Sequence, residues 1–66
     1  MTAQEIIELV EIGLKANPEA TRVAMNHTMY KSLRDEDCLR INQMFNSYEP
    51  RIHIVPSLPD GKIIVE

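Results

Sequence analysis

The stretch Arg51–Glu66 constrains the fold more than any other part of this chain of 66 residues. Two short runs rich in β-branched residues, Arg51–Val55 and Lys62–Val65, flank a loop that reads P-S-L-P-D-G. Valine and isoleucine have restricted χ1 torsions and suit a pleated surface. Pro59 presets the φ that a turn needs, and Gly61 can adopt a positive φ. We therefore predict a β-hairpin with a loop of about six residues.

Helical signals fill most of the chain before this stretch. Thr2 and Glu5 have the spacing of a capping box, and an apolar stripe at helical spacing follows them. Asn17 precedes a proline, which ends the helix because the residue before proline is disfavoured in the α region. Farther on, Asn26 is a good N-cap for the next helical segment.

The segment Asn26–Asn46 can form one bent helix or two helices. Its acidic run, Asp35 to Asp37, is better explained as a second helix start, with Asp35 as the cap and the other acids facing the helix dipole. We therefore favour two helices.

The order of elements is helix, strand, helix or helices, strand, strand, which predicts an α+β fold in a single domain, residues 1–66. Thr21–Met25 is expected to pair in parallel with Arg51–Val55 through a helical crossover, and Lys62–Val65 to run antiparallel. The result is a small three-stranded mixed sheet with helices packed on it. The apolar stripes predict a core of Ile6, Leu9, Val10, Leu14, Val23, Met25, Leu33, Ile41, Phe45, Ile52, Ile54 and Ile64.

Charge, hydropathy and cysteine content argue against several classes of protein. The formal net charge is −3, and the basic residues are scattered, which argues against nucleic-acid binding. No apolar run approaches the length of about 20 residues that a membrane span needs. Cys38 is the only cysteine, so an internal disulfide is excluded. Together with an N-terminus that has no signal-peptide pattern, this predicts a cytoplasmic protein.

Few residues suggest catalysis or metal binding. His27, Cys38 and His53 lack zinc-site spacing, and the acids at 35–37 lack the pattern of a calcium loop. Glycine is too rare for a phosphate-binding loop. We expect no cofactor, no metal and no enzymatic activity. A minor enzyme that uses Cys38 or a histidine remains the least favoured alternative.

The last strand is the most promising interaction element. Lys62, Ile63, Ile64, Val65 and Glu66 form a flat, apolar run with a charge only at each end, and such an edge strand must be covered or paired. A domain of this size also has a thin stability margin. We therefore expect a non-enzymatic interaction module that self-associates, as a two-fold homodimer, and binds another, unidentified protein by strand addition.

An alternative function is binding of a small anionic, nucleotide-like ligand at an oligomer interface. Tyr48, Arg51 and His53 are the residues that we expect to line such a site.

Several motifs resemble a recurrent segment of the peripheral domain of tailed-phage major capsid proteins: T-R-V-A-M-N, H-T-M-Y-K-S-L and I-H-I-V-P-S-L-P-D-G-K-I-I-V. The residues that carry this resemblance are Met25, Asn26, Tyr30, Leu33, Leu58, Pro59, Asp60 and Gly61. The chain departs from the family because the long helix and the axial domain are missing. The resemblance therefore implies a small phage-type protein built on a similar αβ unit, acting in the cytoplasm of the host cell, and not a shell-forming protein.

Overall fold

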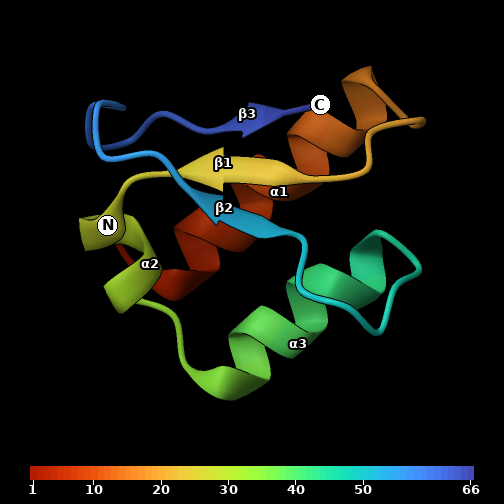
Figure 1. The fold of residues 1–66 in the computed structure, drawn as a ribbon, viewed down its shortest axis with the longest axis horizontal. Coiled ribbons are helices and arrows are strands. Elements are labelled where there is room, and N and C mark those ends of the chain that lie inside the picture. Colours follow the sequence, from red (N-terminus) through yellow and green to blue (C-terminus); the bar gives the residue numbers. More distant parts are fainter.

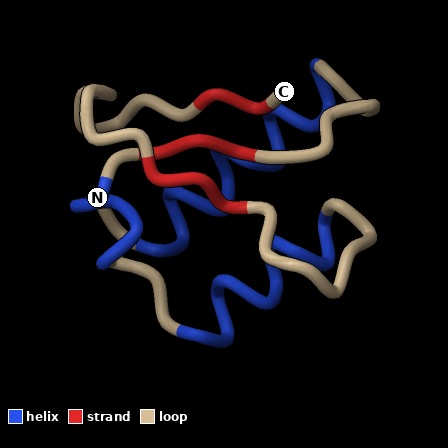
Figure 2. Tube along the Cα trace, in the orientation of Figure 1, coloured by secondary structure: helices blue, strands red, loops and turns tan.

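The computed structural model describes residues 1–66 as three helices and three short strands. In chain order they are α1 (Ala3–Ala16), β1 (Val23–Met25), α2 (His27–Lys31), α3 (Asp35–Met44), β2 (Ile52–Ile54) and β3 (Ile64–Val65) (Figure 1). The α+β class and the order of elements agree with the sequence prediction. The segment Asn26–Asn46 holds two helices, as we favoured. The strands are short, and loops make up much of the C-terminal part of the chain (Figure 2).

The sheet is mixed, with the strand order β2-β1-β3. β1 runs parallel to β2, with Val23 opposite Ile52, and antiparallel to β3, with Val23 opposite Val65. The two C-terminal strands therefore form as predicted, but they do not pair with each other as a hairpin. The reason lies in β1, whose three residues are all buried. In the central position, the backbone N–H and C=O groups on both edges of this apolar strand are paired. The connection 55–63 passes the end of β1 and carries the chain from β2 to β3.

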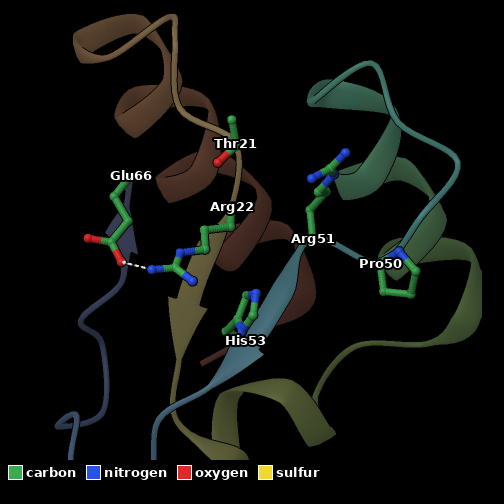
Figure 3. A pocket seen from close by; sticks show the side chains of 6 residues that line it. All are labelled: Thr21, Arg22, Pro50, Arg51, His53 and Glu66. Atoms are coloured by element: carbon green, nitrogen blue, oxygen red, sulfur yellow. Dashed lines mark hydrogen bonds and ion pairs between the residues drawn. The ribbon is translucent and has the colours of Figure 1, made fainter.

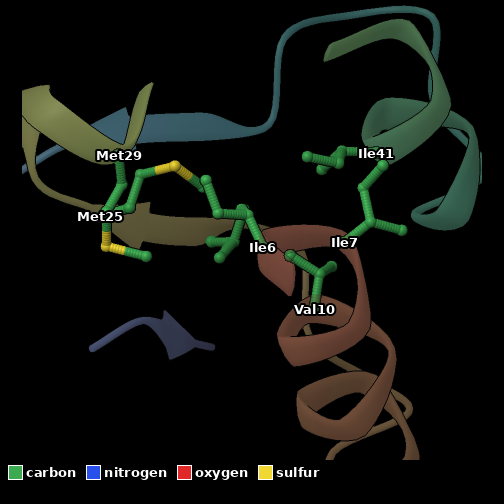
Figure 4. Packing of buried hydrophobic residues seen from close by; sticks show 7 residues of the cluster. Ile6, Ile7, Val10, Met25, Met29 and Ile41 are labelled. Atoms are coloured by element: carbon green, nitrogen blue, oxygen red, sulfur yellow. The ribbon is translucent and has the colours of Figure 1, made fainter. Parts of the chain in front are cut away.

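One apolar cluster joins the sheet to the helices on one of its faces. α1 packs against α3 and β3, and α3 packs against β2. Figure 4 shows the side chains of Ile7 and Ile41 meeting between α1 and α3, with two methionines beside Ile6. The fully buried cluster consists of Ile6, Ile7, Val10, Val23, Met25, Met29 and Ile41.

The predicted core was right in its centre and wrong at its margins. Ile54 and Ile64 are 42% and 37% exposed, because both lie on edge strands. Five further predicted members are only partly buried and line the rim of the cluster: Leu9, Leu14, Leu33, Phe45 and Ile52. Ile7 and Met29 were missed. α1 meets a helix as well as the sheet, so its buried face is wider than a single stripe, and Ile7 falls within it.

The helix starts follow local hydrogen bonding. Thr2 and Glu5 form the predicted capping box, with the Glu5 N–H donating to Thr2 Oγ1 at 3.2 Å and the Thr2 N–H to Glu5 Oε1 at 3.0 Å. Asn26 caps α2 as predicted. The cap of α3 was predicted one residue too late: it is Arg34, and its N–H donates to Asp37 Oδ2 at 2.9 Å. Asp37 accepts this hydrogen bond from within the first turn, so Asp35 is not needed as the cap and forms the first residue of the helix.

Asn26 also ties the loop between β2 and β3 to the end of β1. Its side-chain Oδ1 accepts from the Met29 N–H at 2.8 Å, and its Nδ2 donates to the carbonyl of Leu58 and to Asp60 Oδ1. It is the one buried polar residue, and these bonds satisfy it. The loop that carries the chain from one sheet edge to the other is thereby fixed in place.

Candidate anion-binding site on the open face of the sheet

The sheet face opposite α1 and α3 is polar at one end. Side chains alternate along a strand, so Arg22, Ala24, His53 and Ile64 share this face. The register places His53 beside Ala24 and Ala24 beside Ile64. One step earlier along β1 and β2, Arg22 comes opposite Arg51. This brings two arginines together from segments far apart in the sequence.

The two arginines border the largest hollow in the molecule, a shallow depression of about 510 Å³. Its lining is entirely non-hydrophobic apart from a proline, and comprises Thr21, Arg22, Pro50, Arg51, His53 and Glu66. Figure 3 shows Arg22 turned toward Glu66, whereas Arg51 projects separately, past the start of β2, and the His53 ring lies at the base between them. We call these six residues the arginine hollow.

The two guanidinium groups differ in their partners. Arg22 donates from Nη2 to Glu66 Oε1 at 3.2 Å, and this is the only ion pair in the chain. Both side chains are about half exposed, at 51% and 56%, so the pair contributes little to stability. Arg51 has no acidic partner, and its Nε is buried without any hydrogen bond. A buried donor without a partner is unfavourable. The guanidinium as a whole also has no counter-charge in the chain, because no acidic side chain pairs with it.

The backbone around Arg51 is held firmly. Its N–H donates to Asn42 Oδ1 at 3.0 Å, which connects the start of β2 to α3. Its carbonyl accepts from the Val23 N–H at 2.9 Å, which connects it to β1. On the other side of the hollow, Arg22 exchanges both backbone hydrogen bonds with Glu66. The hollow is therefore built on paired backbone segments, which fix the positions from which its side chains project.

Chemically, the arginine hollow offers positive charge and N–H donors to an oxyanion. A guanidinium group can hold a carboxylate or phosphate through two parallel hydrogen bonds. The imidazole of His53 and the hydroxyl of Thr21 add donors nearby. Of the two guanidinium groups, that of Arg51 is the one without an acidic partner in the chain.

Only part of the predicted ligand site comes together in the structure. Arg51 and His53 share the arginine hollow, as expected of neighbouring positions on one strand face. Tyr48 does not join them: it is 98% exposed and borders a different hollow with Gln43, Asn46 and Ser47. The turn at Asn46, where φ is +55°, and the bends that follow carry Tyr48 away from β2.

Arg22 and Thr21 were missed as site residues. The signal was nevertheless present in the sequence. The predicted parallel pairing of the two strands already places Arg22, near the start of one, close to Arg51 at the start of the other.

The segment Lys62–Glu66 lies at the opposite edge of the sheet. Only Ile64–Val65 is strand, and one edge of it pairs with β1 while the other is open. Lys62 and Ile64 are exposed, whereas Ile63 and Val65 are half-buried against the apolar cluster. Glu66 is engaged by Arg22 within the same chain.

Cys38 and the histidines do not assemble into a reactive or metal-binding group. Burial of Cys38, followed by the negative charges of Asp35 and Asp37, raises the pKa of its thiol above the ordinary value of 9.0. A raised pKa lowers the thiolate fraction and so the reactivity. No three His, Cys, Asp or Glu side chains lie close enough together to bind a metal ion. None of the helices has the length and apolar character of a membrane span.

Comparison of the chain with protein family models, curated proteins and solved structures found no match. The resemblance to the peripheral domain of phage capsid proteins therefore stays a prediction.

Proposed function

We propose that this protein is a non-enzymatic binding module that recognises an oxyanion, a carboxylate or a phosphate, of its partner in the arginine hollow. The observation that supports this most strongly is the pair Arg22 and Arg51. One guanidinium is neutralised by Glu66, and the other has a buried Nε without a hydrogen-bond partner. An oxyanion would supply the counter-charge that the guanidinium of Arg51 lacks within the chain.

The site is suited to binding more than to catalysis. It is wide and shallow, whereas enzymes usually enclose their substrates in order to exclude water. Its side chains project from paired backbone segments, so the backbone needs little ordering when the anion arrives. The overall negative charge of the protein does not oppose this function, because the acids of α1 and α3 lie on elements packed against the other face.

The proposal is tested by titrating the ¹⁵N-labelled protein with inorganic phosphate at constant ionic strength. We expect saturable shifts of the Arg22, Arg51 and His53 resonances. Arg51→Gln should weaken binding by about tenfold or more, since a hydrogen bond to a charged group contributes about 1.5–3 kcal/mol.

A matched control is Arg40→Gln, which removes the same charge from an exposed position on α3. Equal loss of affinity in the two variants would show that only net charge matters, and would refute recognition in the arginine hollow.

Self-association through Lys62–Glu66 is the second candidate. It is favoured by the open edge of β3 and by the exposed Ile64 beside it. The ladder available is short, however, because β3 comprises only Ile64–Val65. Sedimentation of the wild-type protein and of Ile64→Lys tests this candidate. A wild-type dimer that the lysine converts to a monomer supports it, and a folded wild-type monomer at high concentration refutes it.

Two broader proposals are consistent with this role. A cytoplasmic location agrees with a single, weakly reactive thiol at Cys38. A phage or prophage origin is supported only by the sequence resemblance, and small binding modules of this kind would suit it.

A further inference from the structure

We infer that the partner's anion is carried by an extended acidic segment that adds to the outer edge of β2, with apolar side chains alternating between its acids. This inference rests on the proposed function, since it names the class of ligand that places an oxyanion in the arginine hollow. Three features of β2 support it: an unpaired edge, an apolar groove beside that edge, and cations on the opposite face.

The outer edge of β2 is not paired with any strand, because β1 is its only neighbour in the sheet. The hydrogen bonds to β1 use alternate residues: Arg51 accepts from Val23 at 2.9 Å, and the Val55 N–H donates to Met25 at 2.8 Å. In a parallel ladder, every second residue bonds the neighbouring strand, and the residues in alternation with them point their N–H and C=O groups away from that strand. Ile52 and Ile54 therefore present free backbone groups to an incoming strand.

An apolar groove runs beside this edge, toward α3. It has a volume of about 180 Å³. Its lining residues, which we call the β2 groove, are Tyr30, Cys38, Asn42, Pro50, Ile52 and Ile54. Ile54 is 42% exposed and Tyr30 is 37% exposed, although both side chains are largely apolar. The volume suits one aliphatic side chain of the added strand.

The two faces of β2 differ in chemistry. Ile52 and Ile54 point to the side of the β2 groove, whereas His53, and Arg51 just before it, lie on the open face in the arginine hollow. Side chains of an added strand would alternate in the same way. Those on one side would enter the β2 groove, and those on the other would lie next to Arg51 and His53. Charge complementarity then requires acids on that second side, because Arg51 has no acidic partner of its own.

A second copy of this chain fits the edge poorly. Its exposed edge strand, β3, has Ile63 and Val65 packed against its own core, and Glu66 already binds Arg22. Pairing two β2 edges would bring the Arg51 side chains of two copies close together without an acid between them. The occupant is therefore a segment of another protein.

The test uses three synthetic peptides added to the ¹⁵N-labelled protein. The first is acetyl-Glu-Val-Glu-Val-Glu-amide, the second has the same composition in the order Glu-Glu-Val-Val-Glu, and the third is the first peptide with the backbone nitrogens of all five residues methylated. We expect the first to shift the amides of Ile52 and Ile54 and to bind about tenfold more tightly than the other two. The scrambled peptide cannot match both faces, and the methylated one lacks main-chain donors.

Two variants test the placement. Ile54→Lys puts a charge at the mouth of the β2 groove and should reduce binding of the first peptide about tenfold, while leaving phosphate binding in place. Leu39→Lys makes the same change at an exposed position of α3 that does not line the groove, and should leave both unchanged.

The outcomes separate this inference from the proposed function. Phosphate binding at Arg51 with equal affinity for all three peptides would overturn the inference and leave the proposed function standing. If neither phosphate nor peptide shifts Arg51, both fail. A folded Ile54→Lys protein that binds the first peptide as well as the wild type does would also overturn it, as would a dimer whose interface is the β2 edge.

Discussion

Gly13 holds α1 close to β3, and replacing it with alanine tests how tightly these elements pack. A Cβ at Gly13 would lie 2.4 Å from Val65 Cγ2 and 2.9 Å from Val65 Cβ. Carbon atoms in ordinary contact are about 3.5–4.0 Å apart. Rotation of Val65 can move Cγ2 away, but it cannot move Cβ. The helix or the strand must therefore shift.

The expected cost follows from two opposing effects. Alanine improves helix propensity by about 1 kcal/mol over glycine. Overpacking typically costs about 1–3 kcal/mol, and the fixed Cβ contact places this site in the upper part of that range. We therefore expect Gly13→Ala to lower the free energy of unfolding by about 1–2 kcal/mol. For a domain of this size each kcal/mol corresponds to about 4–8 °C in melting temperature.

Thermal and urea unfolding of four proteins measure this effect: wild type, Gly13→Ala, Val65→Ala and the double variant. Because Val65→Ala removes the nearest atom, Gly13→Ala should cost less in that background, with a coupling energy of about 1 kcal/mol between the two sites. A Gly13→Ala protein stabilised by the full helix-propensity gain of about 1 kcal/mol would refute the close approach.

Three further predictions concern individual side chains. Asn26→Asp should keep the cap of α2 but repel Asp60, and so cost about 1–3 kcal/mol of stability by urea unfolding, with most of the loss recovered by adding Asp60→Asn. The hydrogen bonds from Thr2 lower the pKa of Glu5 below its ordinary value of 4.5, so this carboxylate stabilises the fold above that pH and less as the pH falls through its lowered pKa. The melting-temperature gap between wild type and Glu5→Gln should therefore narrow below about pH 4.5, whereas a Glu11→Gln control should show no such capping effect; an unchanged gap would contradict the capping box. Because the pKa of the Cys38 thiol is raised, it should react with an aromatic disulfide at pH 8.5 more slowly in the folded protein than in urea, and equal rates would show that the thiol is not shielded.

The fold was largely predictable because its local signals are strong. The capping box at Thr2, the cap at Asn26 and the turn glycine at 61, with φ of +82°, each depend on a few neighbouring residues. Strand pairing was harder to predict. A hairpin between β2 and β3 is the local solution, but burial of β1 on both of its edges decides the topology. That preference is a tertiary effect, which a short loop motif does not encode.

The site was predictable only in part, for a related reason. Arg51 and His53 belong to one strand, so their shared face follows from alternation alone. Arg22 joins them only through the parallel register between β1 and β2. Tyr48 is close to Arg51 in sequence but lies apart from it in space, because bends separate it from β2. The unpartnered state of Arg51 Nε depends on packing around the whole side chain, which no sequence pattern describes.

The most direct test of oxyanion recognition observes the Arg51 side chain itself. The Nε–Hε resonance of Arg51 is followed by NMR while phosphate replaces chloride at constant ionic strength. We expect a saturable shift of this resonance, with a smaller one for Arg22, because phosphate binds the guanidinium of Arg51, which has no acidic partner in the chain. A small linear drift, no different from that of the exposed Arg40, would contradict the account.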